Sequence, residues 1–282
     1  MQVKDRIADW GEISGPLLIF GGAHSNRHAL DALIALARAE GIPPARVIFT
    51  GDALAYCAHP RDTLARLRDW GPRMIAGNME RSLAEGALDC GCNFEDGTAC
   101  DLMAARWHAH CTAAMDEGAR AFLGALPDRA VFTHAGQRVA VIHGAARQVN
   151  GWIWPNAKAV ELLAEFKALE TDTGGPVDRV LAGHCGIAHD RRITPRRELR
   201  WLNAGAIGLP PHDGDPRTQY ARIDAAGRIT LHRLSYDHDA AARDMEAAGL
   251  PQGYADALRS GWWPSEDTLP PAFRRLPGEG AA

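Results

Sequence analysis

The sequence predicts an α/β fold, in which short buried strands alternate with amphipathic helices around a mostly parallel sheet. Two observations carry this prediction. Short runs of apolar residues, such as residues 17–20, recur along the chain and have the length of buried strands. Helical patterns separate the first of these runs, as in βαβ units. With 282 residues and an ordinary globular composition, the chain is long enough for one large core or two modest domains.

In the first half of the chain, each element follows from its residue pattern. Residues 17–20 are wholly apolar and predict a strand. Residues 26–40 predict a helix, because the apolar side chains from Leu30 to Leu36 fall mostly on one side. Gly41 and the prolines after it end that helix. The other elements predicted here are a strand at 46–50, a helix at 61–70, a strand at 73–76 and a long helix at 102–126.

The second half is dominated by shorter strands, predicted at residues 130–133, 139–143, 180–182, 199–202, 220–223 and 229–234. Gly136 and Gly227 are typical of hairpin turns between two such strands. One helix, at 156–169, interrupts them. We interpret residues 1–238 as one domain. Residues 239–282, which are helical and then proline-rich, are interpreted as an appendage that packs on this domain.

Composition excludes several classes of protein. The net charge of −4 gives no basic excess, so we expect no nucleic-acid-binding surface. The longest apolar runs are too short to span a bilayer, so we expect no membrane segment. The N-terminus lacks the apolar region of a secretory signal, which predicts a cytoplasmic location. In that compartment the six cysteines are expected to be reduced thiols or metal ligands, not disulfides.

Polar residues follow five of the predicted strands, where ligands collect in α/β sheets. The five motifs are GGAHSN (21–26), GDALAYC (51–57), GNMERS (77–82), VIHGA (141–145) and AGHCG (182–186). Each motif pairs a glycine, which lets the backbone turn sharply, with His, Asp or Asn. These side chains supply the oxygen and nitrogen ligands that suit Mn, Fe or Zn. Five such motifs in order are a stronger signal than any one of them.

The order of the motifs resembles the signature of the calcineurin-like metallophosphoesterases: D-x-H, G-D, G-N-H/C-D/E, H-G and G-H-x-H. The resemblance covers roughly residues 16–235. The segments HSNRHAL (24–30) and LNAGAIGLPPHDGDPRTQYARID (202–224) also resemble stretches of the bacterial phosphodiesterase-like branch. The resemblance implies a four-layer α/β/β/α sandwich and a two-metal phosphoesterase centre.

When the family's ligands are carried over residue by residue, the resemblance implies that its two metal positions differ in this chain. One position keeps all its ligands, at Asp52, Asn78, His143 and His184. The other corresponds to Gly22, His24, Asp52 and Gly186, so two of its four ligands are missing. We therefore expect one tight site for a divalent Mn, Fe or Zn ion and a weak or empty second site.

Other positions in and near the motifs have alternative roles. The family's candidate proton donor corresponds to Met79, whose thioether has no proton to give. His24 and Arg81 are our candidate catalytic residues, His24 as a weak ligand or phosphate hydrogen-bonder and Arg81 as a bidentate phosphate contact. The alternative for His24 is a structural hydrogen-bonder, and the alternative for Arg81 is a solvated arginine at the start of a helix. Cys57 and Cys185 are candidate additional ligands or neighbours of the metal, with small buried thiols as the alternative.

The function that this pattern indicates is metal-dependent hydrolysis of a small phosphodiester or phosphomonoester. The alternative is a catalytically inactive protein of the same fold that binds a metal or a phosphate-containing ligand. Gly22, Met79 and Gly186 favour that alternative, whereas the intact ligand set favours the enzyme. A further hypothesis is a separate metal site with thiol ligands, built from Cys90, Cys92 and Cys100 together with Cys111, His108 or His110.

Overall fold

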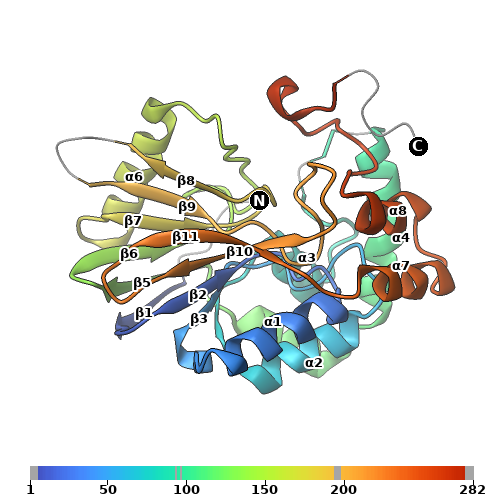
Figure 1. The fold of residues 1–282 in the computed structure, drawn as a ribbon, viewed down its shortest axis with the longest axis horizontal. Coiled ribbons are helices and arrows are strands. Elements are labelled where there is room, and N and C mark those ends of the chain that lie inside the picture. The colour runs from blue at the N-terminus through green and yellow to red at the C-terminus, as the bar shows by residue number, and fades with distance from the viewer. Residues whose placement is uncertain (1–5, 93, 96, 194–197, 277–282) are drawn as a thin grey trace.

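Two stacked β-sheets with helices on both outer faces form the core of the computed structural model, which describes residues 6–92, 94–95, 97–193 and 198–276 (Figure 1). The five-stranded sheet has the order β11 (Ile229–Leu234), β10 (Thr218–Ile223), β2 (Leu17–Phe20), β3 (Val47–Phe49) and β4 (Arg73–Met74). The six-stranded sheet has the order β1 (Ile7–Glu12), β5 (Arg129–His134), β6 (Gln137–Val141), β7 (Arg179–Ala182), β9 (Arg200–Asn203) and β8 (His189–Arg192).

Strand β2 shows why the molecule is layered. Successive side chains of a strand point to opposite faces, and all four residues of β2 are buried. Leu17 and Ile19 pack into the core between the two sheets. Leu18 and Phe20 pack into the core beneath the helices. An uninterrupted apolar strand therefore requires cover on both sides, which the second sheet and the helices provide.

Helices supply the two outer layers. On the five-stranded sheet, α1 (Arg27–Ala39) and α2 (Pro60–Trp70) bury Leu33 and Leu67. On the six-stranded sheet, α6 (Ala159–Thr173) buries Phe166 against Trp201. The resulting order of layers, visible in Figure 1, confirms the expected four-layer α/β/β/α sandwich.

The remaining helices gather at the end of the sandwich where strands β2, β3 and β4 terminate. They are α3 (Asn78–Glu85), α4 (Ala99–Ala113), α7 (His238–Ala247) and α8 (Gln252–Ser260), and α5 (Glu117–Ala125) packs against α3. Two 3-10 turns are also present, one at Pro44–Arg46 directly before β3 and one at Pro271–Phe273. Helix α7 packs against both α1 and α8, so the C-terminal segment lies on the body of the protein (Figure 1). Within the part of the chain that the structure describes, no helix combines the length and the apolarity that crossing a membrane requires.

Most predicted strands and helices are present within a few residues of their expected bounds, including the hairpin turns at Gly136 and Gly227. Two edge strands, β1 and β8, were not predicted. The predicted helix at 102–126 is wrong as a single element, since α4 and α5 are separate. The break follows from Asp116, whose carboxylate accepts a hydrogen bond from Ala119 N at 2.7 Å and starts a new helix.

Candidate metal centre

Five polar side chains from both sheets converge at one end of the sandwich. Each follows a strand at its carboxyl end: His24 after β2, Asp52 after β3, Asn78 after β4, His143 after β6 and His184 after β7. His24, Asp52, Asn78 and His143 are buried, and His184 is half-buried. The structure therefore brings together the four predicted ligands of the intact metal position, with His24 beside them.

His143 is the centre of this group. Its Nε2 lies 3.1 Å from Asp52 Oδ2, 3.1 Å from Asn78 Oδ1 and 3.2 Å from His184 Nδ1. On the other side of the ring, Nδ1 lies 2.7 Å from the carbonyl oxygen of Thr50, to which it donates a hydrogen bond. In the neutral imidazole this bond leaves Nε2 with a lone pair and no proton.

The donor set fits a divalent cation. With His143 neutral, four electron-pair donors face one another: an imidazole lone pair, a carboxylate oxygen, an amide oxygen and a second imidazole. A cation between them converts these repulsive contacts into bonds. Nitrogen and oxygen donors of this kind suit Zn, Fe or Mn. The group of Asp52, His143 and His184 also has all its donor atoms within 4.8 Å of one another.

Electrostatics agree with this geometry. Burial lowers the pKa of His24 to about 4 and the pKa of His184 to about 3, so both rings are neutral ligands near neutral pH. Burial alone would raise the pKa of Asp52, but His143 outweighs it and holds that pKa well below its usual range. Burial lowers the pKa of His143, but Asp52 raises it more, so the net direction is upward. A proton and a divalent cation would therefore compete for the same lone pair on Nε2 of His143.

The backbone around the ligands is strained. His24, Asp52 and His184 adopt left-handed conformations with φ of 51°, 65° and 64°. Such conformations cost of order 1–3 kcal/mol each for residues other than glycine, and they persist only where the surroundings fix them. Hydrogen bonds do this here, since His24 N donates to the carbonyl of Asp52 at 3.1 Å.

Glu80 is a site residue that sequence reasoning missed. Its fully buried carboxylate accepts hydrogen bonds from the backbone N–H groups of Asp52 at 2.9 Å, Ala53 at 2.7 Å and Gly77 at 2.6 Å. Burial, then the nearby Asp52 charge, raises the pKa of Glu80 against the effect of these bonds. Glu80 thereby ties the loop after β3 to the start of α3. The signal that could have found it is its match to the acidic position that ends the G-N-H/C-D/E signature, although that match does not say which groups the carboxylate binds.

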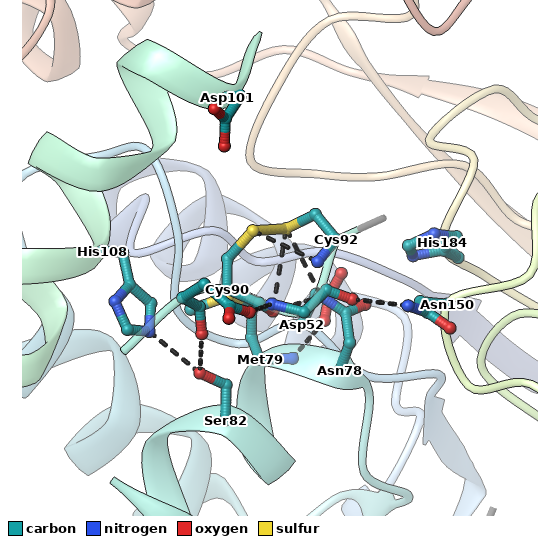
Figure 2. Close-up of a disulfide and its surroundings, with 12 residues drawn as sticks. Asp52, Asn78, Met79, Ser82, Cys90, Cys92, Asp101, His108, Asn150 and His184 are labelled. Carbon is teal, nitrogen blue, oxygen red and sulfur yellow. Dashed lines mark hydrogen bonds between the residues drawn. A yellow bond between two sulfur atoms is a disulfide. The ribbon is translucent and has the colours of Figure 1, made fainter. Parts of the chain in front are cut away.

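A disulfide orients Asn78. Cys90 and Cys92 are joined, and their loop lies beside Asn78, with His184 across from it (Figure 2). Asn78 Nδ2 donates to the carbonyl of Cys90 at 3.0 Å and to the sulfur of Cys92 at 3.5 Å. With Nδ2 held, Oδ1 is turned toward His143. The expectation that the cysteines form no disulfide is therefore wrong for this pair.

The open thiol-site hypothesis finds no support. His108 contacts Ser82 Oγ at 2.9 Å (Figure 2), and His110 contacts the carbonyl of Ala58 at 3.0 Å, so neither faces the disulfide. Cys100 and Cys111 are buried free thiols. Among the described residues, the groups able to hold a metal include no cysteine.

The remaining candidates lie as follows. Burial raises the pKa of the Cys57 thiol far above its usual range and that of Cys185 to about 12. Cys57 Sγ donates to Gly208 O at 3.7 Å and Cys185 Sγ to Ile187 O at 3.6 Å, as protonated thiols do. The Met79 side chain packs in the helix-covered core.

Arg81 is placed away from the ligands. It is 3% exposed, and its guanidinium binds Asp128 at 2.7 Å and the carbonyl of Leu126 at 2.6 Å. The structure thus gives Arg81 neither a phosphate-facing position nor the solvated one that was its alternative. These partners neutralise the buried guanidinium, and the contacts connect α3 to the residues just before β5.

A cavity of about 60 Å³ opens next to the ligands. His24, Asp52 and His184 line it on the sandwich side, and Trp152 covers His184 with ring centroids 4.1 Å apart. The C-terminal segment forms another wall, through Trp263 and its neighbours. None of the described residues that line it is Lys or Arg, so these residues give the cavity no cationic side chain.

Comparisons with known proteins agree with this architecture. The model of the calcineurin-like phosphoesterase superfamily domain matches residues 16–228. A metallophosphoesterase from Sphaerobacter thermophilus superposes with a TM-score of 0.67 and 22% identity, covering 88% of this chain and 100% of its own. A hypothetical protein from Pyrococcus horikoshii superposes with a TM-score of 0.72 and 17% identity, covering 88% and 99%. No curated protein matches the sequence.

Proposed function

Because this chain belongs to the calcineurin-like phosphoesterase superfamily, we propose that it hydrolyses phosphoester bonds with one tightly held divalent metal ion. The observation that carries the proposal is the convergence of Asp52, Asn78 and His184 on Nε2 of His143. These four residues would hold the ion. When bound, such an ion acts as a Lewis acid and lowers the pKa of water to about 7. A cytoplasmic location remains part of the proposal.

Packing at the two vacated ligand positions supports a single tight metal. A Cβ atom added at Gly22 would lie 2.4 Å from Nε2 of His24, so the imidazole fills the space of a side chain there. At Gly186, an added Cβ would lie 3.5 Å from the indole of Trp263. The indole thus borders the space that a ligand side chain at position 186 would enter. Other side chains lie at both vacated positions, which supports one tight ion, and His24 is the imidazole that remains of the second position.

The protein's own residues then divide the work. Thr50 fixes the tautomer of His143, and Glu80 fixes the loop that carries Asp52. His24, neutral and lining the cavity, has a buried Nδ1 without a hydrogen-bond partner among the described residues. It is suited to hold a proton of water or of the substrate. No group at Met79 protonates the leaving group, so the proposal favours esters whose leaving group departs as a stable anion.

The charge of the cavity favours a phosphodiester. A phosphomonoester carries about two negative charges at neutral pH, as protein phosphates do. A phosphodiester carries one. With neutral histidines and neither Lys nor Arg in the cavity wall, the ion is the main positive charge available. The aromatic wall, including Trp152 and Trp263, suits an apolar group on the ester.

The test is hydrolysis of an aryl phosphodiester and an aryl phosphomonoester with Mn, Fe, Zn or Mg supplied in turn. Asp52→Asn serves as the control. We expect turnover with at least one metal, faster on the diester, that disappears in the control. Metal binding without turnover in any condition would refute the proposal and support the inactive, ligand-binding alternative. No metal binding at micromolar concentration would refute the proposal and leave, of the alternative, only a protein that binds a phosphate-containing ligand.

A further inference from the structure

A second group of converging ligand side chains lies outside the cavity, where the C-terminal segment meets the first two helices. His28 is in the first turn of α1, His59 directly precedes α2, and Asp244 is in α7. The Nε2 atoms of His28 and His59 each lie 2.7 Å from the same oxygen, Asp244 Oδ2. The donor atoms of all three residues lie within 4.8 Å of one another. We propose that His28, His59 and Asp244 bind a divalent cation of the zinc type.

The chemistry of the three side chains supports a cation here. Two imidazole nitrogens and one carboxylate are a frequent zinc donor set, with a water in the fourth position. Ligands about 2.0 Å from a tetrahedral ion are about 3.3 Å apart. The 2.7 Å contacts therefore need to open by only a few tenths of an ångström to admit the ion. The side chains are 21%, 25% and 37% exposed, so they have room to adjust and water has access.

A second carboxylate lies behind one of the ligands. Asp62 Oδ2 is 3.8 Å from Nδ1 of His59, on the ring side opposite Asp244. Metal-bound histidines usually give their other ring nitrogen to a carboxylate or carbonyl, which orients the ring and strengthens it as a ligand. Arg27 lies 3.9 Å from the same carboxylate. At 3.8 Å the Asp62 carboxylate does not hydrogen-bond the ring, but it is near enough to do so after a small movement of either side chain.

The position of the site indicates what the cation does. The loops before α1 and α2 are already joined, since His59 N donates to the carbonyl of Ser25 at 3.1 Å. Asp244 comes from α7, which packs on α8, and Tyr254 of α8 and Trp263 beyond it line the catalytic cavity. A cation at this site fastens the C-terminal segment to the α1 and α2 layer. It stabilises one wall of the cavity without entering it.

The experiment measures bound zinc after equilibrium dialysis of the full-length protein at micromolar zinc. His59→Gln and Asp244→Asn are compared with wild type and with His238→Gln. The control removes another imidazole from α7, where His238 Nδ1 is 3.9 Å from Asp239. We expect His59→Gln and Asp244→Asn each to lose one equivalent of zinc and the control to lose none. Equal zinc in all four proteins would overturn the proposal and leave a hydrogen-bonded His–Asp–His group.

A second measurement separates this site from the metal centre. In a protein that combines Asp52→Asn, His143→Gln and His184→Gln, bound Co²⁺ should still give the visible absorption of a low-coordinate site. Adding Asp244→Asn should abolish it. Asp62→Asn should weaken binding about 10- to 100-fold, as loss of an outer-layer partner does. Absence of the absorption in the triple variant would overturn the proposal without bearing on hydrolysis.

Discussion

Replacing Glu80 by Gln tests whether this buried carboxylate organises the metal centre. The change keeps the size of the side chain and removes its charge. Oε2 of Glu80 accepts from Asp52 N and Gly77 N, and Oε1 accepts from Ala53 N. A Gln oxygen can keep the first two bonds, but its NH₂ group then faces the N–H of Ala53. Two donors are left unpaired in a site with no solvent access.

The magnitude follows from these contacts. An unpaired buried donor costs about 1–3 kcal/mol, and hydrogen bonds to a charged group exceed neutral ones by about 1 kcal/mol. Relief of a buried charge offsets part of this. We expect Glu80→Gln to lower the free energy of unfolding by about 2–4 kcal/mol. At about 2 °C per kcal/mol for a chain of this length, the melting temperature should fall by about 4–8 °C.

The assay is thermal unfolding in chelator, followed by metal titration of the folded protein. The titration should show weaker binding, because Glu80 holds the loop that carries Asp52. Glu117→Gln is the matched control, since Glu117 is exposed in the first turn of α5 and should change stability by less than about 0.5 kcal/mol. A Glu80→Gln protein with unchanged melting temperature and unchanged metal affinity would refute the reasoning.

Three further predictions concern the surroundings of the ligands. Replacing Cys90 and Cys92 together by Ser should weaken metal binding about tenfold, because Asn78 Nδ2 loses the loop that orients it. The measurement is a competition titration with a chromophoric chelator, and an unchanged affinity would count against this prediction. Arg81→Leu should lower the free energy of unfolding by about 3 kcal/mol in denaturant unfolding, because the buried Asp128 carboxylate loses its Arg81 partner. A raised KM at unchanged stability would instead show that Arg81 contacts the substrate. In chelator, the protein should lose stability as pH falls from about 6.5 toward 4, because the unfolded chain takes up protons on His24 and His184 that the folded chain, with pKa values of about 4 and 3, does not. The raised pKa of His143 acts with the opposite sign, and its effect lies above about pH 6.5; equal denaturant midpoints at about pH 7 and 5 would contradict the prediction.

The sequence predicted an element well where burial requires a run or a regular spacing of apolar residues. β2 is continuously apolar because both its faces are covered, and it was predicted at its observed bounds. β1 and β8 were missed because edge strands have no such signal. β8 reads His-Asp-Arg-Arg, and β1 is half exposed and irregular between Asp9 and Glu12. Their pairing depends on the neighbouring strand and not on their own side chains.

The same distinction applies to the site. Asp52, Asn78, His143 and His184 could be assigned because each stands in a glycine-containing motif at a strand end. The roles of Glu80 and of the Cys90–Cys92 loop depend on which backbone groups they meet after folding. No local pattern encodes that. His28, His59 and Asp244 are separated by long stretches of chain and share no motif, so only the docking of α7 brings all three together.

Because Trp263 lies against Gly186, the substitutions that one position tolerates depend on the residue at the other. Gly186 has φ of 71°, a backbone conformation that is strained for any other residue. A Cβ atom added there would lie 3.5 Å from the indole of Trp263. A histidine introduced at position 186 alone would therefore meet both obstacles. Substitutions at the two positions should be strongly non-additive. A second metal ligand at position 186 would therefore be easier to restore after a change in the C-terminal segment, so packing influences the order in which such mutations are accessible.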